Sequence, residues 1–178
     1  MPTGSGSAQI FYDPTQASNL NDVTLRFDPG YEVDFQGKRF VYVKHNKGTG
    51  SIATAAGAAA YWSDVANGVA TADKSDGQQG GTAGAHGAMC AGVYQAVVTD
   101  GYGTWLQKRG VMAGVLLASG DTNGLAGNKI FPPVTNVDST FRSEALDSIS
   151  AEEISAQVVG YQVGAGASNT ATVFLQII

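Results

Sequence analysis

The sequence predicts an all-β fold: a single compact β-barrel or β-sandwich domain with an extended N-terminal arm and at most one short helix. Short runs of β-branched and aromatic residues recur roughly every eight to twelve residues, as in sandwiches and barrels. Turn residues close these runs, and the chain carries 24 glycines. Only 14% of the residues are charged and 43% are apolar, a composition that favours a folded chain over a disordered one.

Residues 1–30 are predicted to form the arm, and residues 31–178 the β-rich domain. The opening MPTGSGS has little apolar surface to bury and is expected to be mobile. Ile10, Phe11 and Tyr12 then form an isolated apolar cluster within a polar stretch. Two interpretations follow: the cluster anchors the arm on a neighbouring molecule, or it folds back onto its own domain.

The first strands are expected directly after the arm. Residues 31–36 alternate apolar and polar side chains, which predicts a half-buried strand. Residues 40–44 carry β-branched and aromatic side chains on both faces, which predicts a second strand. The alanine-rich stretch from residue 52 contains Gly57 and lacks a helix N-cap, so we expect a loop leading into a short strand at 59–63.

Turn signals divide the middle of the chain. The Asn67-Gly68 pair predicts a two-residue hairpin turn, because both central positions of that turn need positive φ, with a return strand at 69–72. Residues 91–110 are interpreted as strand, turn and strand about Asp100-Gly101. Residues 111–118 then form another apolar strand.

The last third predicts one helix and two strands. The helix, or helical turn, is expected at 143–155, and the closing strands at 156–163 and 170–178. The final strand is apolar on both faces, with Phe174 and Ile178 on the face opposite Val173, Leu175 and Ile177. Such a strand is usually internal to a sandwich or barrel, or buried in a subunit interface.

No catalytic or metal-binding pattern is visible in the sequence. His45 and His86 lack metal-ligand spacing, and the single cysteine, Cys90, is expected to pack as a small buried apolar residue. No G-x-S-x-G motif occurs, and the glycine-rich run 77–87 lacks the Lys-Ser/Thr of a phosphate loop. We therefore expect no enzymatic activity, no cofactor and no metal.

Charge and hydropathy exclude two classes of partner. The formal net charge is −5, and the only adjacent basic pairs are Lys38-Arg39 and Lys108-Arg109, so no basic stripe for nucleic acid is present. The longest run of small apolar residues, 52–62, is about half of the ~20 residues that a membrane span needs. Because no signal peptide opens the sequence, we expect a protein made in the cytoplasm that binds neither nucleic acid nor membranes.

Aromatic side chains are the best candidates for contacts at the surface, namely Tyr61, Trp62, Tyr94, Tyr102 and Trp105. Aromatic rings carry protein contacts and also line sugar-binding platforms. Their alternation with valine and leucine favours packing in the core or between subunits over a sugar platform.

Three segments carry a further pattern: FVYVKHNKGTGSIATAAGAAAYWSDVANGVAT, AGVYQAVVTDGYGTWLQKRG and VVGYQVGAGASNTATVFLQII. An Asn- and Gly-rich strand exit leads through small residues to a Tyr-Trp strand. A Tyr/Trp-Gly strand pair and an apolar C-terminal strand follow. In these features the chain resembles the decoration (cement) proteins of tailed bacteriophage heads.

The resemblance implies a non-enzymatic structural virion protein, a subunit that binds the outer surface of the assembled head and stabilises contacts between major capsid proteins. It also implies a homotrimer. The residues expected at capsid or subunit interfaces are Ile10, Phe11, Tyr12, Trp62, Tyr102, Trp105, Phe174 and Ile178. Two alternatives are a carbohydrate-binding β-module, using Trp62, Tyr102 and Trp105, and another virion component of the tail or fibre.

Overall fold

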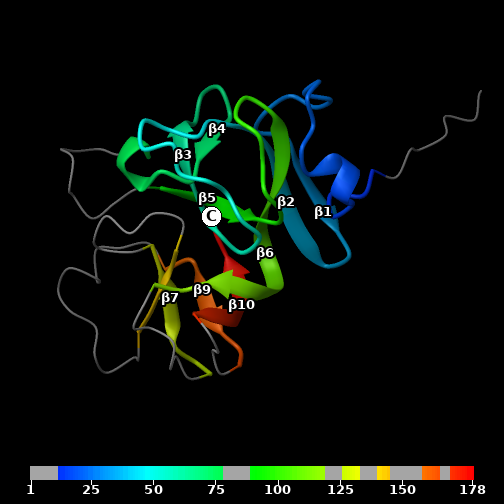
Figure 1. The fold of residues 1–178 in the computed structure, drawn as a ribbon. Coiled ribbons are helices and arrows are strands. Elements are labelled where there is room, and N and C mark those ends of the chain that lie inside the picture. The colour runs from blue at the N-terminus through cyan, green and yellow to red at the C-terminus, as the bar shows by residue number, and fades with distance from the viewer. Residues whose placement is uncertain (1–11, 78–88, 119–125, 133–139, 145–157, 165–168) are drawn as a thin grey trace, which may run out of the picture.

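The computed structural model describes residues 12–77, 89–118, 126–132, 140–144, 158–164 and 169–178. This part of the chain is nearly all β, with a closed five-stranded barrel and further strands outside it, which confirms the predicted fold class (Figure 1). Its helices are two 3₁₀ turns, η1 (Ala17–Asn19) and η2 (Lys74–Asp76). The strands are β1 (Glu32–Phe35), β2 (Lys38–His45), β3 (Ala59–Asp64), β4 (Val69–Thr71), β5 (Cys90–Tyr94), β6 (Gly103–Leu116), β7 (Lys129–Phe131), β8 (Arg142–Glu144), β9 (Gly160–Gln162) and β10 (Thr170–Gln176).

The barrel consists of β2, β4, β3, β5 and β6 in that order, and the pairing of β2 with β6 closes it. β2 and β4 are parallel, and the other neighbours are antiparallel. Strand β1 pairs outside the barrel on β2, with Val33 and Phe35 half-buried and Glu32 and Asp34 exposed, as the alternation predicts. Closure leaves no free strand edge within the barrel itself.

Strand β6 extends beyond the barrel into the remainder of the same ten-stranded sheet, and we call that remainder the second sheet. Its first half pairs with β2 and its second half with β10, and β9, β7 and β8 continue the sheet from there (Figure 1). The two strands predicted on either side of Gly110 are therefore one strand of 14 residues. Gly110 has φ +94°, so the position that resembles a strand end is a bend within a continuous strand.

The two-residue turn predicted at Asn67-Gly68 is wrong, although the hairpin itself forms. Asp64 pairs with Val69, so the loop holds four residues, and only Gly68 of the predicted pair has positive φ. The Asp64 carboxylate accepts hydrogen bonds from both the backbone N–H and the side-chain amide of Asn67, which stabilises the longer loop. The return strand β4 forms where it is predicted.

Of the three elements predicted in the last third of the chain, the two strands form and the range predicted as a helix begins within a strand instead. Strands β9 and β10 lie within the predicted ranges 156–163 and 170–178. Of the helix predicted at 143–155, the first two residues belong to strand β8, where they pair with β7. The remaining residues of that range lie outside the described residues.

The part of the predicted arm that the structure describes, residues 12–30, lies against the barrel. Leu20 is buried, and Asp22 forms a backbone bridge with Gly103 at the start of β6. The Asp22 carboxylate also accepts a hydrogen bond from the buried Tyr42 hydroxyl at 2.9 Å. These contacts attach the segment to two strands of the barrel.

Candidate functional site

Three apolar side chains form a row across the outer face of the second sheet. Phe174 of β10 lies directly opposite Val111 of β6 on one side and Tyr161 of β9 on the other. Side chains opposite each other on one face of an antiparallel pair are in contact range, with Cβ atoms about 4.5–5.5 Å apart. Val111, Phe174 and Tyr161 are 48%, 36% and 40% exposed, so we call them the apolar row.

The pleat of β10 explains why the row faces outward. Val173, Leu175 and Ile177 are buried in the core with residues of both the barrel and the second sheet, so the alternate residues must face away from it. Val163, two residues beyond Tyr161, is also exposed and donates its backbone N–H to the Thr172 carbonyl. The second sheet thus buries one face and leaves an apolar surface on the other.

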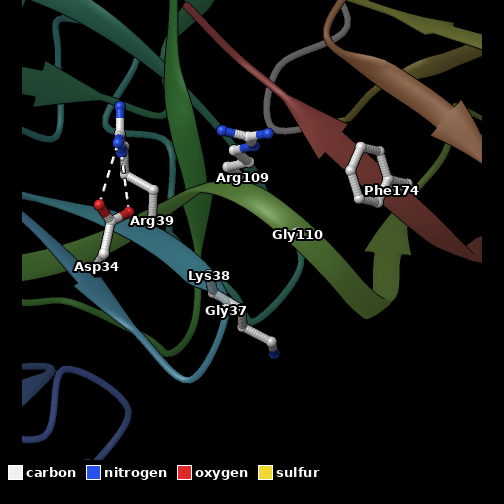
Figure 2. Close-up of a pocket in the computed structure, with 7 residues that line it drawn as sticks. All are labelled: Asp34, Gly37, Lys38, Arg39, Arg109, Gly110 and Phe174. Atoms are coloured by element: carbon white, nitrogen blue, oxygen red, sulfur yellow. Dashed lines mark hydrogen bonds and ion pairs between the residues drawn. The ribbon is translucent and has the colours of Figure 1, made fainter.

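A charged pocket of about 400 Å³ adjoins this row at Phe174 (Figure 2). It is lined by the β1–β2 turn, the bend of β6 and β10, with Asp34, Gly37, Lys38, Arg39, Arg109, Gly110 and Phe174 as its lining residues. In the close-up, Arg109 lies between the Asp34–Arg39 pair and the Phe174 ring. The pocket therefore combines an aromatic wall with cationic side chains.

Arg39 and Arg109 are directly opposite each other in the pairing of β2 with β6. Like charges in such a position destabilise a sheet. Asp34 offsets part of this repulsion through two hydrogen bonds from the Arg39 guanidinium, of 3.0 and 3.1 Å. The pKa of Asp34 is lowered, chiefly by these bonds and further by the charges of Arg39 and Arg109.

The remaining cations of this region differ in whether they have a counter-ion. The Nζ of Lys108 lies 2.6 Å from the Glu32 carboxylate, at the bulge where β6 gains a residue over β2. The side chains of Lys38 and Arg109 make no hydrogen bond or ion pair with any other described residue. Neither Lys38 nor Arg109 therefore forms an ion pair within the described part of the chain, although the charge of Arg109 acts on Asp34.

Of the residues predicted at interfaces, the two closing-strand positions lie at the surface. Phe174 is in the apolar row, and Ile178 is 95% exposed. Tyr102 is partly buried against the barrel core. Tyr12 packs onto the protein's own aromatic cluster, with ring centroids 4.6 Å from Phe27 and 5.9 Å from Trp105. Ile10 and Phe11 lie outside the described residues.

The prediction of Trp62 and Trp105 as interface residues is corrected by their burial. Trp62 is 9% exposed and packs with the barrel core, whereas Trp105 is 1% exposed and belongs to a separate aromatic cluster with Tyr42 and Phe40. Trp62 points into the barrel, whereas Trp105 lies on the opposite face of β6 from the core residue Leu106 and is covered by the rings of Tyr12 and Phe27. Trp62, Tyr102 and Trp105 therefore form no shared exposed platform on which a sugar could stack.

Sequence reasoning missed the other members of this surface. Val111 and Tyr161 sit in short apolar runs whose outward face cannot be assigned before the strand pairing is known. The signal for the pocket was present in the two adjacent basic pairs, Lys38-Arg39 and Lys108-Arg109, which the β2–β6 pairing brings together. The two basic pairs lie far apart in the sequence, so their proximity could not be predicted before the strand pairing was known.

Two titratable side chains, those of His45 and Cys90, are buried. His45 is buried and its Nδ1 lies 2.9 Å from the Tyr94 hydroxyl; burial lowers the pKa of His45, and the charge of Asp100 opposes that shift. Cys90 is buried as predicted, and burial raises the pKa of its thiol to about 12. Among the described residues, no three His, Cys, Asp or Glu side chains gather closely enough to hold a metal ion.

No protein-family model matches this chain, and neither does any curated protein. Within the described ranges, no helix has the length and hydropathy needed to cross a membrane.

Proposed function

We propose that this chain is a non-enzymatic structural virion protein, a capsid decoration subunit that binds the outer surface of an assembled phage head and stabilises contacts between major capsid proteins. The observation that carries the proposal is the apolar row of Val111, Phe174 and Tyr161 on the outer face of the second sheet. Contiguous exposed apolar surface on a folded domain marks an interaction site. The resemblance of three segments to decoration proteins supports the choice of a capsid as the partner.

In this proposal the protein acts through burial of surface. A standard protein–protein interface removes about 1,600 Å² from water, and its energy is concentrated in a few buried aromatic or apolar side chains. The Phe174 ring, flanked on both sides, has the position of such a central residue. Each subunit would contribute one modest contact, and repetition over the shell would make the stabilisation collective.

Binding to shells that lack the protein tests the proposal. Wild-type protein should co-sediment with the shells, and Phe174→Ser should bind at least tenfold more weakly because it removes the central ring. Two further variants compare an exposed valine inside the row with one outside it. Val111 lies in the row, whereas Val97, which is also exposed, lies in the loop between β5 and β6; each is replaced by serine. Only Val111→Ser should reduce binding; wild-type protein that ignores shells would refute the proposal.

The proposed homotrimer is tested separately by light scattering of the purified protein. A trimer would place copies around a threefold position, where closed symmetry gives every subunit the same contact. A monomer that still binds shells would remove the trimer and leave the decoration function in place.

A further inference from the structure

We infer that the pocket beside Phe174 receives an acidic segment of the capsid partner, in which carboxylates lie next to an apolar side chain. The inference rests on the proposed function and adds to it the chemistry of the surface recognised. It starts from the juxtaposition of the apolar row with Lys38, Arg39 and Arg109 around one pocket (Figure 2).

The charge balance of the pocket is opposite to that of the chain. The whole sequence carries a formal net charge of −5, yet three cations, Lys38, Arg39 and Arg109, line this pocket with a single carboxylate, Asp34. Asp34 pairs with Arg39. Lys38 and Arg109 remain, so the pocket has two positive charges available for a partner and an acidic segment complements them.

The placement of Arg109 supports an anionic partner more strongly than its charge alone. Arg109 is exposed and lies opposite Arg39, an arrangement that disfavours the folded sheet in the absence of further carboxylates. A guanidinium binds a carboxylate through two parallel hydrogen bonds, and Asp34 already shows this geometry on Arg39. A partner carboxylate on Arg109 would relieve the repulsion in the same way.

Phe174 sets the second requirement on the partner. Its ring lines the pocket and is also the middle of the apolar row, so an occupant that fills the pocket contacts both Arg109 and the ring. A strongly hydrated inorganic anion would gain nothing from that contact. A polypeptide with an apolar residue beside its carboxylates would use both.

The test compares two identical substitutions on strand β2. Lys38 lines the pocket, whereas Lys44 is an exposed lysine six residues further along the strand, about 20 Å away at ~3.3 Å per residue. We expect Lys38→Glu to bind shells at least tenfold more weakly than Lys44→Glu, and Arg109→Gln to weaken binding in the same direction. Wild-type binding should also fall steeply as salt is raised from 50 to 500 mM, since exposed charges are screened.

The outcomes separate the inference from the proposed function. Equal binding by Lys38→Glu and Lys44→Glu, with wild-type protein bound, would overturn the acidic-segment inference and leave the decoration function standing. A Lys38→Glu variant that changes only the oligomeric state would assign the pocket to a second copy of this chain, and would also overturn it. Failure of wild-type protein to bind shells would overturn both.

Discussion

Gly57 provides the sharpest test of how the barrel is joined to the second sheet. Its φ is +84°, and a Cβ added there would lie 1.9 Å from the carbonyl oxygen of Gly114 in β6. Its backbone N–H donates to the Tyr94 carbonyl at 2.8 Å, and its own carbonyl accepts from the Leu116 N–H at 2.9 Å. The residue therefore connects the end of β5 to the end of β6 at van der Waals contact.

Substitution of Gly57 by alanine has two costs that can be separated. Positive φ disfavours any residue with a Cβ by about 1–2 kcal/mol, and reduced freedom of the unfolded chain offsets about 0.4–1 kcal/mol of it. Relief of the clash requires a movement of about 1 Å in a close-packed interior, which breaks both hydrogen bonds at about 1 kcal/mol each. We expect Gly57→Ala to lower the free energy of unfolding by about 3 kcal/mol.

The control is Gly101→Ala. Gly101 has φ +81°, and an added Cβ there would meet nothing within 4 Å, so this variant has the backbone cost alone, about 1 kcal/mol. Urea unfolding followed by tryptophan fluorescence measures both variants, with the midpoint compared at constant slope. Equal midpoints for the two variants would refute the reasoning, because they would show that the approach of Gly57 to β6 does not limit stability.

Three further predictions concern buried polar groups. Asp22→Ala should lower the free energy of unfolding by about 2–4 kcal/mol, because it leaves the buried Tyr42 hydroxyl and two backbone N–H groups unpaired. Asp28 is exposed, so Asp28→Ala should change the free energy of unfolding little. Equal urea midpoints for the two variants would contradict this prediction. The lowered pKa of His45 means that the unfolded chain binds the proton more readily, so stability should fall as pH drops below about 6.5. That fall should be smaller in His45→Gln in urea titrations at pH 7 and pH 5, and an identical fall would exclude His45 as its source. Cys90, with its raised pKa, should react with a thiol reagent such as 5,5′-dithiobis(2-nitrobenzoate) only after unfolding; rapid labelling of the native protein would contradict its burial.

Burial also defines how Asp22 titrates. Burial alone would raise its pKa, but hydrogen bonds from the backbone N–H groups of Arg26 and Thr24, and from the Thr24 and Tyr42 hydroxyls, lower it overall. A carboxyl with a lowered pKa contributes stability above its unfolded value of about 3.9 and loses it as pH falls further. The acid-induced loss should therefore have two stages, the first from His45 below about 6.5 and the second below about 3.9 from the carboxyl groups whose pKa values are lowered, Asp22, Asp34 and Asp73 among them.

Local sequence determined the strands that alternate or are apolar on both faces. β1, β2 and β10 could be placed because side-chain periodicity is a property of consecutive residues, and β3 because Gly57 and the missing N-cap argued against a helix. The burial of Cys90 could be predicted for a similar reason, since its neighbours are small and apolar. The predictions of a virion location, a capsid partner and the lack of enzymatic activity stay predictions.

Only the tertiary structure decided how these strands are joined. Gly110 resembles a terminator in sequence, yet the pairing of β6 with β2 before it and β10 after it makes the strand continuous. Trp105 resembles a surface aromatic, yet ring contacts with Phe27 and Tyr42 bury it. Whether a strand continues and whether a ring is buried depend on which segment, distant in the sequence, packs beside it.

The candidate surface illustrates the same division. The sequence by itself determined that Phe174 sits on the opposite face of its strand from Val173, because successive side chains alternate. It could not determine that Val111 and Tyr161 lie on either side of Phe174, or that Arg39 faces Arg109 seventy residues later. Register between strands is set by packing and hydrogen bonding across the whole sheet, so a surface built from several strands is decided only when the chain folds.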